Sequence, residues 1–349
     1  MKFSPLAKAG MLAVLIVVIF FSFWEYHLRS KGLGISYDDG PELWTNKRAA
    51  VYAPSNQATV FIGSSRHKFD LDIATWQSLT GEKAIQLAFE GTSPLPALND
   101  LANDPLFKGK LVIDVTEGLL FTTMPYYSKR INSAIAYSKK ITPTQRVSFQ
   151  VNHLLESKLV FLNKDFYSLN ALLNKTNLPP RAGIMSEPDF PVEFGPVNFE
   201  RQDIMTEKFV HDTSLQNKVR GIWVSLGKMA AAAPHPTQKD IDSIFNAIKT
   251  DVVKINSRGG QVLFVRSPSS GPFREGEKKA FPREVFWNRI LASTGSQGIH
   301  FEDYPTLSQF QCPEFSHLTP SDAIVYTKNL VAIIEKEKGW SFSNKPSVN

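Results

Sequence analysis

The chain has 349 residues, of which 42% are hydrophobic and 21% are charged, as in a folded globular protein and not a disordered one. The net charge is +6, but Lys and Arg are scattered, whereas nucleic-acid-binding proteins usually cluster them on one face, so we expect no nucleic-acid partner. Cys312 is the single cysteine, which excludes an intramolecular disulfide and a cysteine-based zinc site.

The first predicted element is an uncharged apolar segment over residues 9–24, between Lys8 and Glu25. A helix of this length spans about 24 Å, slightly less than the ~30 Å hydrocarbon core of a bilayer. Trp24 and Tyr26 stand where an interfacial aromatic belt would lie. Because bulky residues occupy the place of a signal-peptidase site, an uncleaved anchor in the lipid bilayer is favoured over a cleaved signal peptide. A long domain after a short N-terminal tail is then expected outside the cytoplasm.

The next segment, residues 27–56, is polar and rich in turn-forming residues, and we expect a stalk. β-rich runs follow, and most of them lead into a helical pattern, which predicts a parallel sheet covered on both faces by helices. The expected strands are residues 58–62, 84–89, 111–116, 261–265 and 298–301. The expected helices are residues 71–79, 126–140, 142–174, 240–256, 279–294 and 321–338.

The alternation of strands and helices is interrupted between residues 118 and 235, first by helical patterns and then by a proline-rich stretch. We expect this segment to be a helical and irregular insertion that forms a lid or a subdomain. The predicted organisation is a membrane anchor at 1–26, a stalk at 27–56, an α/β domain from 57–117 and 236–340, the insertion at 118–235, and a tail at 341–349.

The residues with candidate chemistry follow the ends of the predicted strands. In a parallel sheet the carboxyl ends of the strands border the ligand crevice, and Ser65, Gly91, Glu117 and Arg266 all follow such ends. Gly63 permits a tight turn that would present the hydroxyl and backbone N–H of Ser65 at a helix N-terminus, where developing negative charge is stabilised. The alternative interpretation is that this serine only caps the helix.

A second candidate motif lies just before the last helix, where His317 follows Glu314 by three positions. On a tight loop this spacing lets the carboxylate reach the imidazole Nδ1, fix its tautomer and stabilise the imidazolium. Asp303 is the competing acid because it directly follows the last strand. The alternative is an ordinary surface histidine beside a helix start.

Three further residues complete the candidate site. Gly91 can bring a bare backbone N–H close to a reacting oxygen, as a second oxyanion donor, or it can form an ordinary turn. Arg66 and Arg266 could clamp an anionic or hydroxyl-rich substrate, or they could form ion pairs. The histidines lack the spacing of metal ligands, and no nucleotide-binding glycine pattern is present, so neither a metal nor a cofactor is expected.

These motifs resemble those of the SGNH (GDSL-like) hydrolase superfamily. Gly63-Ser64-Ser65 resembles its first block, Gly91 its second, and Glu314-x-x-His317 its last, with glutamate in place of the usual aspartate. The third block, which supplies an asparagine to the oxyanion hole, is absent, and the third strand leads to Glu117 instead. In this respect the chain is similar to membrane-anchored proteins of cell-envelope acylation, of the D-alanine transfer and alginate O-acetylation type.

The resemblance implies a three-layer α/β/α, flavodoxin-like domain with Ser65 as nucleophile, His317 as base and Glu314 as its acid, and with the N–H groups of Ser65 and Gly91 as oxyanion donors. It implies a serine O-acyltransferase or esterase that acts on an envelope glycan or polymer beside a membrane-bound O-acyltransferase. The expected location is the bacterial cytoplasmic (inner) membrane, as a single-pass protein with its main domain in the periplasm or outside the cell. The alternative is a non-catalytic SGNH scaffold that binds glycan or assembles an acyltransferase complex.

Overall fold

A computed structural model describes residues 4–53, 57–164, 168–174 and 188–342 of the chain. The chain divides into two compact units. The smaller unit comprises Met1–Asp38 and Thr142–Glu187, and the larger one comprises Asp39–Ile141 and Pro188–Asn349. Most of the expected tail at 341–349 lies outside the described residues.

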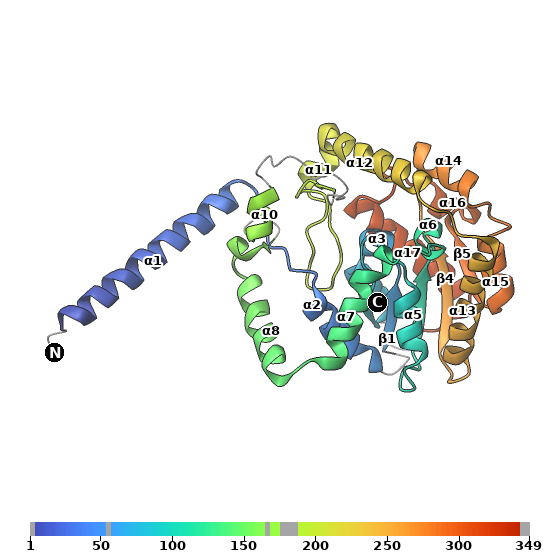
Figure 1. Ribbon diagram of the computed structural model, residues 1–349, viewed down its shortest axis with the longest axis horizontal. Helices are drawn as coiled ribbons and strands as arrows, with labels where there is room; N and C mark the ends of the chain where they lie inside the picture. The colour runs from blue at the N-terminus through green and yellow to red at the C-terminus, as the bar shows by residue number, and fades with distance from the viewer. Residues whose placement is uncertain (1–3, 54–56, 165–167, 175–187, 343–349) are drawn as a thin grey trace, which may run out of the picture. The chain divides into compact units, whose positions relative to one another are not determined.

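The larger unit contains a five-stranded parallel sheet with the strand order β2-β1-β3-β4-β5. This confirms the prediction of an α/β protein with a parallel sheet. The strands are β1 (Ala58–Ile62), β2 (Lys83–Gln86), β3 (Lys110–Asp114), β4 (Gln261–Arg266) and β5 (Gln297–His300). Figure 1 labels β1, β4 and β5 among the helices of this unit. The chain runs from β1 to β2 on one side and returns to β3 on the other. A crevice is therefore expected at the carboxyl ends of β1 and β3, where the strand order reverses.

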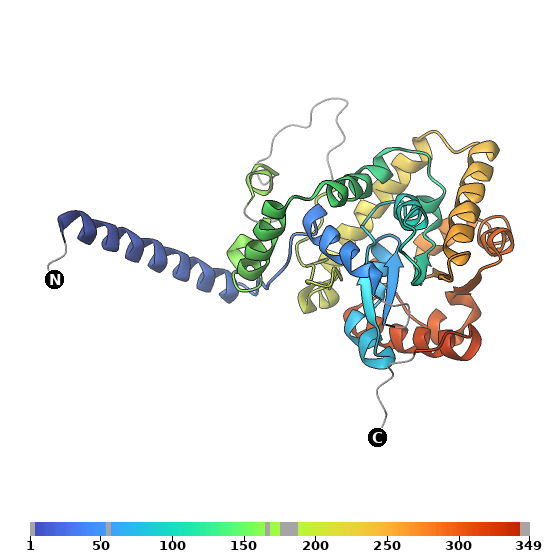
Figure 2. The same ribbon diagram turned by 90° about the horizontal axis from the view of Figure 1, so that it is seen from below.

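Alternate residues of the central strands enter two separate hydrophobic cores, because successive side chains of a strand point to opposite faces. Val60 and Ile62 belong to a core with α5 (Leu95–Ala102) and α13 (Gln238–Asn256). Phe61 belongs to the other core, with α4 (Ile73–Thr80) and α17 (Pro320–Glu337). Helices therefore cover both faces of the sheet, as Figure 2 shows.

The larger unit contains further helices around this framework. They are α2 (Pro41–Ala49), η1 (Ala50–Tyr52), α3 (Ser65–Asp70), α6 (Glu117–Leu120), α7 (Tyr126–Lys140), α11 (Glu207–His211), α12 (Thr213–Ala232), α14 (Gly271–Ala280), α15 (Trp287–Thr294), η3 (Phe301–Asp303) and α16 (Pro305–Ser308). A third hydrophobic cluster, which includes Phe69, Phe194 and Phe209, joins α3 to α11 and α12.

Three segments differ from the sequence predictions. The single helix expected at 279–294 is two helices, α14 and α15, because Pro282 lies between them and cannot continue a helix. The expected stalk at 27–56 is divided, since α2 belongs to the larger unit and buries Trp44 completely. The expected insertion at 118–235 is also divided, because α7, α11 and α12 belong to the larger unit.

The smaller unit contains α1 (Pro5–Ser30), α8 (Pro143–Glu156), η2 (Val160–Leu162) and α10 (Leu169–Asn174). The helix expected over 142–174 is thus broken into shorter pieces. Helix α1 is long and apolar enough to cross a membrane, a property that membrane anchors and signal sequences share. None of its most hydrophobic stretch is buried by the protein.

Candidate active site

Ser65 is presented by a tight turn at the carboxyl end of β1. The turn needs a glycine at position 63, because a Cβ there would come within 2.5 Å of the Asp114 Cβ on β3. The Ser64 hydroxyl is turned away from α3 and bonds to Thr116 Oγ1 at 2.9 Å and to Asp114 Oδ2 at 3.3 Å. Ser64 does not cap α3 with its side chain, and Ser65, the first residue of that helix, is half-buried.

Ser65, His317 and Glu314 form one hydrogen-bonded chain. The Ser65 Oγ lies 2.8 Å from His317 Nε2, and His317 Nδ1 lies 3.0 Å from Glu314 Oε1. His317 is only 1% exposed, and Glu314 is fully buried. The arrangement can move a proton from the serine to the imidazole while a carboxylate faces the opposite ring nitrogen.

The loop that carries the acid and the histidine is fixed by its own backbone. Glu314 Oε1 also accepts hydrogen bonds from the backbone N–H groups of Ser316, at 3.2 Å, and His317, at 2.6 Å. Phe315, which directly follows Glu314, has a φ of 82°, in the left-handed region that non-glycine residues rarely adopt. This conformation folds the carboxylate back toward the imidazole that follows it.

Asp70, at the end of α3, ties this loop to the helix that begins with Ser65. Its Oδ1 accepts a hydrogen bond from the backbone N–H of Leu318 at 2.9 Å. Complete burial raises the pKa of Asp70 well above its ordinary value. Since Ser65 begins the helix and Asp70 ends it, this contact sets the distance between the serine and the histidine.

Trp223, on α12, is a site residue that the sequence analysis did not identify. Its indole Nε1 donates a hydrogen bond of 2.5 Å to Glu314 Oε2. Three aromatic rings surround the imidazole of His317, with centroid distances of 4.5 Å for Phe69, 5.7 Å for Phe194 and 5.9 Å for Trp223. The insertion thus covers the acid–histidine pair with apolar side chains and supplies one polar contact.

The two arginines expected to clamp a substrate lie inside an ion-pair network. Arg266 is fully buried and pairs with Glu117 at 3.2 Å and with Glu277 at 2.5 Å. These contacts favour the alternative of an ion-pair role, and the clamp role stays a prediction. Arg66 is 1% exposed and pairs with Glu277 at 2.5 Å. Burial alone would raise the pKa of Glu277, but the two guanidinium groups lower it to about 2. Among the described residues, Arg66 Nε and Nη1 have no hydrogen-bond partner, so a substrate contact there stays a prediction.

Asp303, the competing acid, is paired elsewhere. Its carboxylate accepts two hydrogen bonds from the Arg283 guanidinium, at 2.7 and 2.6 Å. Glu314 is therefore the acid that the structure pairs with the histidine. Gly91 lies in an exposed turn after β2 with a φ of 60°. Its expected role as an oxyanion donor stays a prediction.

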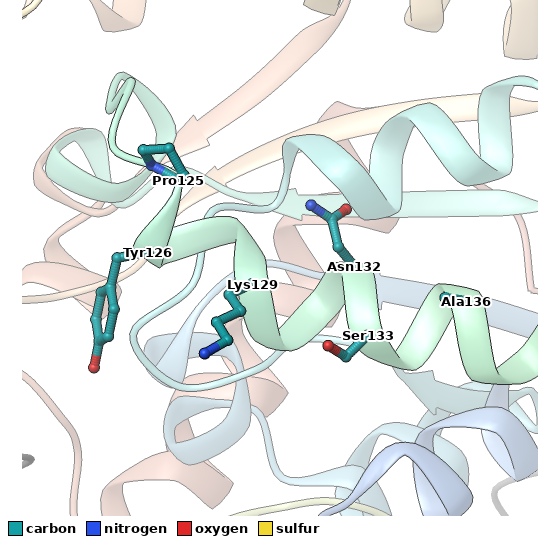
Figure 3. Close-up of a pocket in the computed structure, with 6 residues that line it drawn as sticks. All are labelled: Pro125, Tyr126, Lys129, Asn132, Ser133 and Ala136. Atoms are coloured by element: carbon teal, nitrogen blue, oxygen red, sulfur yellow. The ribbon is translucent and has the colours of Figure 1, made fainter.

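A separate hollow lies along α7 and does not include the serine, histidine or acid. It has a volume of about 480 Å³ and is lined by Pro125, Tyr126, Lys129, Asn132, Ser133 and Ala136 (Figure 3). Within the part of the chain that the structure describes, no group of His, Cys, Asp and Glu side chains could hold a metal ion.

The chain was compared with known proteins. No model of a protein family and no curated protein matches it. The fold and the geometry of the site are therefore what bears on its function.

Proposed function

We propose that the protein is a serine-dependent acyl-transfer enzyme, with Ser65 as nucleophile, His317 as general base and Glu314 as the acid that orients it. The observation that carries this proposal is the continuous chain of hydrogen bonds from the serine hydroxyl through both imidazole nitrogens to a buried carboxylate. Burying a carboxylate costs free energy unless an opposite charge or hydrogen-bond donors stabilise its negative charge. Here the charge favours the imidazolium that forms when the serine loses its proton.

The reaction has two balanced halves. First, His317 Nε2 takes the proton of Ser65 Oγ as the oxygen bonds to the acyl carbon of a donor ester, and His317 then returns this proton to the departing alcohol. The acyl group is left on Ser65. Next, an acceptor hydroxyl gives its proton to His317 as it attacks the acyl-serine. The bond between the acyl carbon and Ser65 Oγ then breaks, and His317 returns the proton to Ser65 Oγ, which releases the new ester and the free serine. Water as the acceptor would instead give a carboxylic acid, and the enzyme would be an esterase.

The negative oxygen of each tetrahedral intermediate needs hydrogen-bond donors. The backbone N–H of Ser65 is one, because Ser64 leaves the first turn of α3 uncapped by its side chain. We assign the second to the backbone N–H of Gly91. Glu117, which follows β3 where a superfamily member would carry its asparagine, binds the Arg266 guanidinium and offers an acceptor instead of a donor. The third donor is therefore different from that of ordinary SGNH esterases.

The strand order β2-β1-β3-β4-β5, with helices on both faces of the sheet, supports a flavodoxin-like, three-layer domain of the SGNH type. The serine follows β1, at the point where the strand order reverses. The acid and the histidine come from the loop before α17. This is the arrangement that the resemblance in the sequence implies.

Helix α1 supports a cell-envelope role for this enzyme. Its length and apolar composition suit a single-pass anchor that holds the main domain in the periplasm or outside the cell. A tether is of use to an enzyme that receives its acyl group from a membrane-bound O-acyltransferase and passes it to an envelope glycan or polymer. We therefore favour a transferase over a soluble-substrate esterase.

A fluorophosphonate probe tests this proposal, because it bonds covalently only to serines that a base activates. We expect the full-length protein in detergent to be labelled, with the adduct mapped to Ser65. The variants Ser65→Ala and His317→Ala should not be labelled, while their thermal unfolding shows an intact fold. Absence of labelling in the folded wild type would favour the alternative, a non-catalytic scaffold that binds glycan or assembles an acyltransferase complex.

A further inference from the structure

We propose that helices α8 and α10 lie in the headgroup region of the lipid bilayer, beside the point where α1 leaves the membrane. This inference rests on one part of the proposed function, namely that α1 is a membrane anchor. It does not depend on the chemistry of Ser65. It assigns a lipid-binding surface to part of the insertion that was expected to form a lid or a subdomain.

One face of α8 exposes a stripe of aliphatic side chains, which we call the α8 stripe. Its members are exposed by 64% at Val147, 52% at Val151, 63% at Leu154 and 43% at Leu155. Their spacing places all four on a single side of the helix. Leu169, Leu172 and Leu173 on α10 are similarly exposed, by 72%, 49% and 47%. An exposed apolar surface of this kind marks a contact with a membrane or another protein.

The other side of α8 holds the helix within its own unit. The centroid of the His153 ring lies 5.5 Å from that of Tyr37, outside α8, and 6.2 Å from that of Phe149, on α8 itself. These aromatic side chains are partly buried. The α8 stripe is therefore not needed for packing within this unit. Within the part of this unit that the structure describes, the α8 stripe stays exposed.

Contacts between η2 and α1 indicate the depth at which this segment would lie in the membrane. The turn η2, which follows α8, stacks Phe161 on Phe21 of α1 at 5.0 Å. Its backbone N–H groups at Val160 and Phe161 donate to the Glu25 carboxylate at 2.9 and 3.1 Å. Phe21 belongs to the apolar part of α1, and the first charged residue after that part is Glu25. If α1 spans the membrane, η2 therefore lies at the boundary between hydrocarbon and headgroups.

This depth explains the polar contacts of the turn. Backbone N–H groups at the edge of the hydrocarbon region need partners within the protein, because water is scarce there. Glu25 provides the acceptor. Arg29 donates a hydrogen bond to the Lys158 carbonyl at 2.9 Å, and the exposed side chain of Lys158 can reach lipid phosphates.

The composition of the surface favours lipid over a protein partner. All seven exposed apolar residues are valine or leucine, whereas the energetic centres of protein interfaces are enriched in tryptophan, tyrosine and arginine. Helix α8 has one aliphatic face and leads directly into η2, which contacts the end of the membrane span, and these are properties of an interfacial helix. The turn η2, which follows α8, also contacts the proposed membrane helix α1 directly.

The test measures the depth of single cysteines in the full-length protein, reconstituted in nanodiscs of phosphatidylcholine and phosphatidylglycerol. Val151→Cys probes α8, Leu172→Cys probes α10, and both are labelled with a bimane fluorophore. Asn152→Cys is the matched control, since it is exposed on α8 but lies off the α8 stripe. Val14→Cys, within α1, is the positive control for lipid. The parent chain gives the background from Cys312, which is 4% exposed.

We expect lipids that carry bromine on their acyl chains to remove about half or more of the fluorescence at Val151→Cys, Leu172→Cys and Val14→Cys, and much less at Asn152→Cys. Quenching of Val14→Cys alone would overturn the inference and leave the anchor intact. Failure to quench Val14→Cys would refute the anchor and this inference with it, while fluorophosphonate labelling of Ser65 would be unaffected. If neither the brominated lipids nor aqueous iodide quenched the labels at Val151→Cys and Leu172→Cys, the surface would be covered by protein, and this result would also overturn the inference.

Discussion

Replacing Trp223 with phenylalanine removes one hydrogen bond from the buried carboxylate and leaves most of the aromatic packing in place. The indole N–H is the donor to Glu314 Oε2, and the acid is fully buried. A hydrogen bond to a charged group contributes about 1.5–3 kcal/mol. If this loss falls on the transition state, acylation of Ser65 should slow by about 10- to 150-fold.

Trp44 provides the matched control for this substitution. It is fully buried, whereas Trp223 is partly buried, and its Nε1 donates to the carbonyl of Leu87 at 3.0 Å. Trp44→Phe should therefore lower the free energy of unfolding by about 1 kcal/mol, as expected for a neutral hydrogen bond, without slowing acylation. Pre-steady-state kinetics with p-nitrophenyl acetate measures the acylation rate, and urea unfolding measures stability.

The comparison between the two variants decides whether Trp223 acts through Glu314. An acylation rate for Trp223→Phe within about twofold of wild type would refute the reasoning, and so would an equal loss of rate in Trp44→Phe. Rates should be normalised to the folded fraction, so that a general loss of stability is not counted as a loss of catalysis.

The remaining predictions concern the acid, the serine turn and the ion-pair network. Glu314→Gln keeps the size of the side chain but removes its charge, and should slow acylation by about a thousandfold to ten-thousandfold in burst kinetics, with unchanged circular dichroism; a smaller loss would count against an orienting role. Gly63→Ala should lower stability by about 1–3 kcal/mol in urea unfolding, because its Cβ would meet Asp114 at 2.5 Å. Gly91→Ala, at a φ of 60° but in open space, should lower stability by only about 1 kcal/mol. A larger loss of stability for Gly91→Ala than for Gly63→Ala would contradict the structure. The pKa of Glu277, lowered to about 2, means that this carboxylate stabilises the fold above its ordinary pKa of 4.5 and loses that contribution as the pH falls toward 2; Glu277→Gln should therefore lose less stability than wild type between about pH 5 and about pH 3, and equal losses would refute the assignment.

The parts of the fold that could be predicted from the sequence are those with local patterns. The run at 58–62 is apolar and followed by glycine, and it forms β1 over the same residues. The other four strands are found within a few residues of their expected bounds. The spacing between Glu314 and His317 is also a local pattern, and the structure gives it the hydrogen bond that the spacing predicts.

The parts that could not be predicted depend on contacts between distant segments. Trp223 reaches Glu314 across 91 positions of the chain, and Arg266 reaches Glu117 across 149. Nothing near these residues distinguishes a site tryptophan from a core one, or a structural arginine from a substrate clamp. The break between α14 and α15 is different, because Pro282 is a local signal in the sequence that can end a helix.

The most direct test of the central claim is intact-mass spectrometry of the full-length protein after incubation with p-nitrophenyl acetate, for wild type and for Ser65→Ala. The account predicts that wild type gains the mass of one acetyl group, that peptide mapping places this group on Ser65, and that the variant gains none. A folded wild type that stays unmodified, or an adduct that persists in Ser65→Ala, would contradict the assignment of Ser65 as the nucleophile.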